Sequence, residues 1–179
     1  MPARVKPLRA IAAPKLISRG PRPEWRIGEL TVVVGPGRAE LRYAREPVGF
    51  CRPEPAAITE GVERARQRLA ARSRKPEELL PAMAAAYARL LRTQRARSGT
   101  RVALVELRTE LGGTRAQFAW DVARLRRERR LVVGGLRIDL GVATGHAAGH
   151  RSRVVWIEND GGGGSYFAWF RLIAQEVVS

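Results

Sequence analysis

Residues 101–133 have the sequence RVALVELRTELGGTRAQFAWDVARLRRERRLVV, and this stretch decides the expected fold. The pattern predicts a helix over residues 102–111 and a second helix over residues 114–130, followed by a strand. Gly112 and Gly113 separate the two helices and predict a tight turn between them. The stretch therefore has the order helix, turn, helix, strand.

The start of the second helix is marked by Thr114 and Gln117, which have the T-x-x-Q spacing of a capping box. Within this helix Phe118, Val122 and Leu125 recur at helical spacing and fall on one face. We expect that face to be buried in a core.

The opposite face of the same helix carries side chains that a core does not require. Arginine and glutamine reach base edges and phosphates in the major groove of DNA. We expect this face to point outward and to contact DNA through Gln117, Trp120, Arg124 and Arg127.

The elements around this stretch extend the pattern. A helix is expected at residues 77–97, a strand at 131–140, a loop at 141–150, a return strand at 151–158 and a third strand at 165–173. Over residues 77–158 this order resembles the winged helix-turn-helix superfamily. The resemblance implies that residues 114–130 enter the major groove, with Arg101 and Thr114 near the DNA backbone at helix N-termini.

The expected fold class is α+β, with a winged-helix core preceded by smaller elements. Residues 1–24 form a basic arm rich in proline, residues 25–54 a β-hairpin around Gly35-Pro36-Gly37, and residues 55–75 a basic helix. Residues 76–179 form the winged-helix domain with an aromatic C-terminal strand.

The charge of the chain points to a polyanionic partner. It has 33 Lys and Arg residues against 17 Asp and Glu residues, a formal charge of +16 and a pI near 11.6. Residues 131–179 hold four charges of each sign, so the whole excess lies in residues 1–130. Such an imbalance is typical of nucleic-acid binding, with double-stranded DNA as the first expectation.

Further arginines are candidate phosphate contacts, although a run of charges is more often only a solvated face. Arg64, Arg68 and Arg72 cluster late in the helix of residues 55–75, and Arg151 and Arg153 lie in the expected wing. The full set of expected DNA contacts is Arg64, Arg68, Arg72, Arg101, Thr114, Arg115, Gln117, Trp120, Arg124, Arg127, Arg151 and Arg153.

Two other functions remain open. A basic tail joined to a small domain is also common in RNA-binding and ribonucleoprotein components. The segment 154–173 is aromatic and lies within the neutral stretch 131–179. It either completes the core or forms a homodimer or protein-partner surface, as an adaptor would need.

The sequence offers little for catalysis. His146 and His150 are the only histidines and Cys51 is the only cysteine, which does not complete a zinc site. No apolar run approaches the roughly 20 residues that span a bilayer. We therefore expect a non-enzymatic, cytoplasmic, nucleoid-associated protein without a cofactor, metal or membrane partner. It would bind double-stranded DNA in transcription control, replication initiation or nucleoid organisation.

Overall fold

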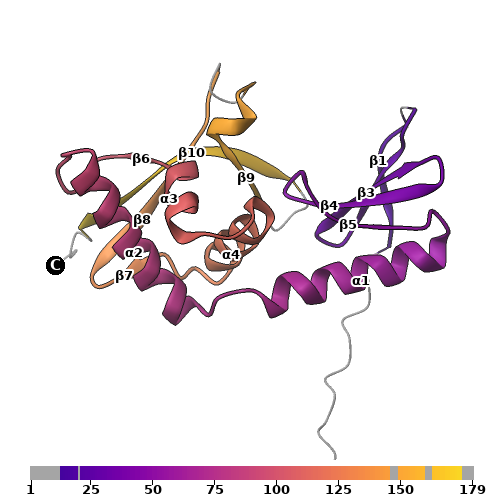
Figure 1. Ribbon diagram of the computed structural model, residues 1–179, viewed down its shortest axis with the longest axis horizontal. Helices are drawn as coiled ribbons and strands as arrows, with labels where there is room; N and C mark the ends of the chain where they lie inside the picture. Colours follow the sequence, from indigo (N-terminus) through magenta and orange to yellow (C-terminus); the bar gives the residue numbers. More distant parts are fainter. Residues whose placement is uncertain (1–12, 20, 146–148, 160–162, 175–179) are drawn as a thin grey trace, which may run out of the picture.

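The computed structural model describes residues 13–19, 21–145, 149–159 and 163–174. Within these residues the fold is α+β, with an N-terminal five-stranded antiparallel sheet, four α-helices and a second antiparallel sheet. Figure 1 shows the two sheets at opposite sides of the molecule, with the helices below and between them. None of the described helices is both long and apolar enough to cross a membrane.

The N-terminal sheet is a meander in which each strand pairs with the next. Its strands are β1 (Lys15–Ser18), β2 (Glu24–Ile27), β3 (Leu30–Gly35), β4 (Arg38–Tyr43) and β5 (Glu46–Cys51). The expected hairpin is thus the centre of a larger sheet, and part of the expected arm is its edge strand. Residues 1–12 and 20 of that arm lie outside the described residues.

The turn between β4 and β5 explains why the larger sheet was not predicted. Ala44 and Arg45 both have left-handed backbone angles, with φ of 51° and 66°. A two-residue turn of this kind usually contains Asn-Gly or another glycine pair. The Ala-Arg sequence gave no turn signal, so the expected return strand ended at Tyr43 and no further strand was predicted after it.

The helix α1 (Pro55–Ala71) packs against the N-terminal sheet and closes a small core. The helical spacing of Ile58, Val62, Ala65 and Leu69 predicts an apolar stripe on this helix. The last three of these residues are buried, and Ile58 is half-buried. Val62 and Ala65 join a cluster with Leu30 and Leu41 from the sheet.

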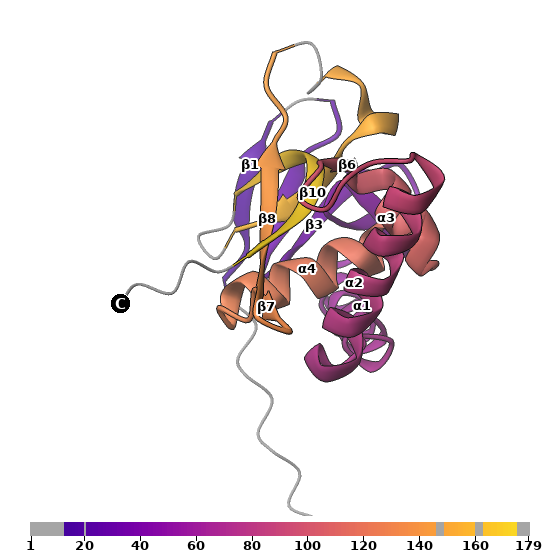
Figure 2. The same cartoon turned by 90° about the vertical axis from the view of Figure 1, so that its left-hand side faces the viewer.

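The second half of the chain contains the remaining helices and the second sheet. Its elements are α2 (Pro76–Thr93), β6 (Val102–Ala103), α3 (Leu104–Leu111), α4 (Arg115–Arg127), β7 (Val132–Val133), β8 (Leu136–Val142), the 3-10 helix η1 (Arg151–Arg153), β9 (Val155–Glu158) and β10 (Gly164–Ala174). The sheet order is β6-β10-β8-β7, and β9 also pairs with β10. Figure 2 shows β8 and β10 side by side above α4.

The strands after α4 differ from the expected wing. Residues 131–140 do not form one strand, because Gly134 and Gly135 adopt φ of 55° and 74° and turn the chain between β7 and β8. The expected return strand 151–158 is divided into η1 and β9. This β9 pairs with β10, not with β8. Residues 146–148 of the expected loop lie outside the described residues.

Two tryptophans of the second sheet lie flat across glycines of a neighbouring strand. A Cβ added to Gly141 would lie 1.7 Å from Cε2 of Trp169, its partner across the β8–β10 pair. A Cβ on Gly164 would lie 2.7 Å from Cε2 of Trp156. The indole rings therefore occupy the space that any other residue would need for its side chain.

We predict that Gly141→Ala destabilises the protein, because the added methyl group overlaps a ring that is already packed against its neighbours. Overpacking of this kind costs about 1–3 kcal/mol or more, measured by urea unfolding. The control is Gly163→Ala, where the new methyl group meets nothing within 4 Å and φ is not left-handed. Equal stability of the two variants would contradict this packing.

Candidate nucleic-acid interface

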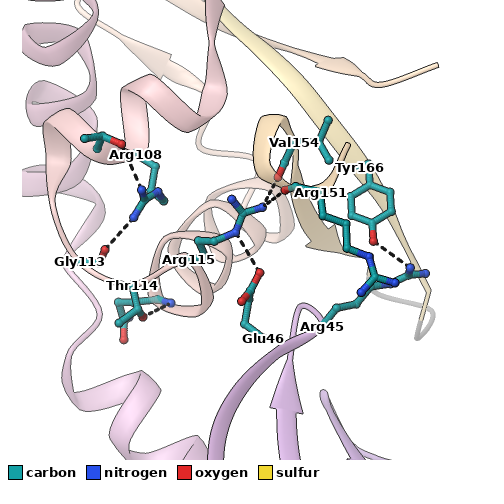
Figure 3. Close-up of polar contacts among 11 residues, drawn as sticks. Arg45, Glu46, Arg108, Gly113, Thr114, Arg115, Arg151, Val154 and Tyr166 are labelled. Carbon is teal, nitrogen blue, oxygen red and sulfur yellow. Dashed lines mark hydrogen bonds and ion pairs between the residues drawn. The ribbon is translucent and has the colours of Figure 1, made fainter. Parts of the chain in front are cut away.

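The helix α4 is the structural centre of the second half of the protein. Its apolar face is buried as expected, including Phe118, Val122 and Leu125. The helix start is also confirmed, because the hydroxyl of Thr114 accepts a hydrogen bond of 3.1 Å from the backbone N–H of Gln117. Arg108 braces the preceding turn by donating to the carbonyl of Gly113 (Figure 3).

The polar face of α4 does not point outward as expected. Trp120 packs edge-on against Tyr43 of β4, with 5.0 Å between the ring centres. Gln117 donates to the carbonyl of Leu69 at 3.1 Å. These contacts join α4 to the N-terminal sheet and to α1.

Arg124 is half-buried and already has a partner within the protein, since its guanidinium donates to the backbone carbonyl of Arg74 in the α1–α2 connection. Of the four side chains expected to read bases, only Arg127 is exposed. The physical reason is that a second part of the protein packs against α4, in addition to the core of the second half. The N-terminal sheet and α1 cover the face that a solitary winged-helix domain would leave to solvent.

Arg115 connects three parts of the chain at the start of α4. Its Nε donates to Glu46 at 2.9 Å, and its Nη2 donates to the carbonyl of Arg151 at 2.7 Å and to that of Val154 (Figure 3). One guanidinium thus ties the start of β5, the η1 helix and the chain before β9 to the N-terminus of α4.

A buried carboxylate lies beside this junction. Asp121 of α4 is 4% exposed and accepts hydrogen bonds from the hydroxyl of Ser73 and the side-chain amide of Gln117. Burial raises the pKa of Asp121 above its ordinary value, and the hydrogen bonds from Ser73 and Gln117 oppose part of that rise.

The surface around the N-terminus of α4 is hollowed on two sides. One hollow of about 320 Å³ is lined by Arg68, Arg72 and Arg115, with Thr114 and Gln117 at the helix start. A second hollow of about 240 Å³ shares Arg72, Thr114 and Gln117 and adds Arg74. We call the two hollows together the α4 cleft. It brings together five of the residues expected to contact DNA: Arg68, Arg72, Thr114, Arg115 and Gln117.

The electrostatics of the α4 cleft favour an anion. Backbone N–H groups at a helix N-terminus carry partial positive charge, and the first turn of α4 has no acidic residue. Four arginines line the cleft against Glu46 and the buried Asp121. Glu46 is paired with Arg115, so Arg68, Arg72 and Arg74 set the charge of the opening.

The other expected contacts lie elsewhere. Arg64 pairs with Glu60 on the exposed face of α1. Arg101 lies over the ring of Trp169, 4.2 Å from its centre. Arg151 and Arg153 are exposed in η1. The expected set is therefore not one continuous surface.

The aromatic segment 154–173 has two environments. Phe167 and Phe170 are buried in the core, and Tyr87 packs edge-on against Phe170. Trp156 and Tyr166 are half-buried and contact Arg45, whose guanidinium lies 3.8 Å from the ring centre of Trp156. Arg45 also donates to the hydroxyl of Tyr166 at 2.9 Å (Figure 3).

Sequence reasoning missed the residues that join the two sheets. Arg26 of β2 forms an ion pair with Glu158 of β9, whose side chain is only 6% exposed. Tyr43 and Arg45 reach α4 and β10 from the β4–β5 end of the N-terminal sheet. No local pattern could indicate these contacts, because the partners lie far apart in the chain.

The histidines add no metal centre to this picture. His150 is exposed beside η1, and His146 lies outside the described residues. No group of three or more His, Cys, Asp or Glu side chains gathers at a possible metal site in the described part of the chain.

Comparisons with protein-family models, with curated proteins and with solved structures found no match to this chain.

We predict that Asp121→Asn changes how stability depends on pH. A carboxyl whose pKa is raised in the folded state stabilises the fold at low pH, and this contribution is lost as pH rises through the folded pKa. The free energy of unfolding of the wild type should therefore fall relative to that of Asp121→Asn as pH rises from the ordinary pKa of aspartate, about 4, through the raised pKa of the folded state, measured by urea unfolding.

Ser73→Ala provides the matched comparison. Its hydroxyl donates to Asp121 and favours the ionised form, so its removal should raise the pKa of Asp121 further. The loss of stability with pH should then be larger and extend to higher pH. Parallel pH curves for the wild type and Asp121→Asn would show that Asp121 does not titrate as its burial requires.

Proposed function

We propose that this protein binds nucleic acid without catalysing a reaction, with double-stranded DNA as the first candidate, and that the α4 cleft contacts the phosphate backbone. The observation that carries the proposal is the gathering of Arg68, Arg72 and Arg74 around the N-terminus of α4. The formal charge of +16 supports it, because phosphate contacts supply most of the non-specific affinity of such proteins.

The topology of the second half supports a winged-helix assignment for this proposal. The chain runs through the three helices α2, α3 and α4 into an antiparallel sheet, which is the order of helices and strands that suggested the resemblance, although β9 pairs with β10 and not with β8. In that superfamily the first residues of the second helix of the helix-turn-helix approach the DNA. The corresponding helix start here borders the α4 cleft.

The contacts of α4 argue for backbone binding more than for base reading. Trp120 and Arg124 already have partners within the protein, so they do not reach bases while the two halves stay in contact. Arg127 is exposed and remains a proposed groove contact. We therefore propose binding with weak sequence preference, as in chromosome organisation or a replication complex.

We predict that the double variant Arg68→Gln/Arg72→Gln weakens duplex binding at least tenfold near 0.1 M salt. Each lost phosphate contact should also flatten the logarithmic salt dependence by about 0.9. The measurement is fluorescence anisotropy with a random duplex across a salt series. The control is Arg92→Gln/Arg97→Gln, which removes the same charge from exposed positions that do not line the α4 cleft.

Equal weakening by both double variants would refute the α4 cleft and leave only a general charge effect. Single-stranded DNA and structured RNA serve as competitors in the same assay. Preferential binding of RNA would favour a ribonucleoprotein role. Weak binding of all three would favour an adaptor that docks a protein partner or a second copy through segment 154–173.

A further inference from the structure

A separate cleft lies between the two sheets, away from the α4 cleft. Its volume is about 370 Å³, within the size range of small-molecule sites. We call it the inter-sheet cleft. The N-terminal sheet contributes three arginines, Arg26, Arg42 and Arg45. The second half contributes Arg151, Trp156 and Glu158.

Two of its four arginines are neutralised by carboxylates within the protein. Arg26 pairs with Glu158, and Arg42 pairs with Glu40 at 2.9 Å. The other two arginines are Arg45 and Arg151. Among the described residues, no carboxylate forms an ion pair with either of them. The cleft thus presents two guanidinium groups to solvent from opposite halves of the chain (Figure 3).

Arg45 is held in place before any ligand arrives. Its guanidinium lies over Trp156, and it donates to Tyr166. The ring of Trp156 also lies close to Gly164 and edge-on to Tyr166. These contacts hold the indole in place, and its face already carries the guanidinium of Arg45.

The carboxylates of the cleft restrict what can bind. Glu24 and Glu158 both line the cleft, so a long polyanion passing through it would meet like charges. A compact anion bound by Arg45 and Arg151 would cover less of this lining. Thr31 and Glu24 can hydrogen-bond to hydroxyl or amino groups next to that anion.

We propose that the inter-sheet cleft binds a phosphate monoester, held by Arg45 and Arg151. Two guanidinium groups on a concave site suit the several acceptor oxygens of a terminal phosphate. This chemistry occurs on a free mononucleotide and on the phosphorylated 5′ end of a nucleic-acid strand. The inference does not depend on the α4 cleft.

The test uses the full chain and isothermal titration with adenosine 5′-monophosphate, with adenosine as the probe that lacks phosphate. We expect binding of the monophosphate only. Arg151→Gln should weaken that binding about tenfold or more, since a hydrogen bond between charged groups is lost. The variant keeps the backbone carbonyl of residue 151 that accepts from Arg115.

Arg153→Gln is the matched control, because Arg153 is equally exposed in η1 but does not line the inter-sheet cleft. It should bind the monophosphate as the wild type does. A hexanucleotide with and without a 5′ phosphate distinguishes the two sources. Preference for the phosphorylated strand over the free nucleotide would identify a strand end as the ligand.

Three results would overturn the proposal. The first is equal loss of binding in Arg151→Gln and Arg153→Gln, and the second is equal binding of adenosine and its monophosphate. The third is that neither the monophosphate nor the phosphorylated strand binds. These outcomes are distinct from failure of the duplex proposal. Duplex anisotropy of Arg151→Gln should match that of Arg153→Gln, because neither residue lines the α4 cleft.

Discussion

Contacts between the β4–β5 end of the N-terminal sheet and α4 hold the two halves of the molecule together. Tyr43 packs on Trp120, and Glu46 pairs with Arg115. The ion pair of Arg26 with Glu158 joins the sheets directly. Removing either partner of the Arg26–Glu158 pair would leave an uncompensated charge in a shielded position. Both clefts exist only while this contact is maintained, because each is lined by residues from both halves.

The position of α4 explains how a strongly basic protein can have a specific charged surface. Most of the helix is surrounded by protein, and its N-terminus is the part that borders a cleft. Positive charge therefore lines the cleft at the N-terminal end of α4, and Arg127 is exposed near its C-terminal end. Phosphate binding fits this arrangement better than base reading does, since base contacts need several free side chains along a helix face.

Local features of the fold were predictable where a residue type has one dominant physical effect. Gly112 and Gly113 ended α3, and the hydroxyl of Thr114 capped α4. The turn at Ala44 and Arg45 was not predictable, because neither residue usually adopts left-handed backbone angles. For the site, Arg68 and Arg72 were expected phosphate contacts and do line the α4 cleft, whereas Arg64 and Arg153 do not. Helical spacing shows on which face of a helix a residue lies, but it does not show which part of the protein packs against that face.

Sequence patterns alone predict the α+β class, the helix-turn-helix order, the apolar stripes of α1 and α4 and the excess of positive charge. These features depend on periodicity, turn chemistry and composition, which act over a few residues or over the whole chain. The packing of distant segments, in contrast, turns the polar face of α4 toward the N-terminal sheet and brings Arg45 and Arg151 to one cleft. Those outcomes depend on the docking of two surfaces distant in the chain, and neither surface carries a local sign of its partner.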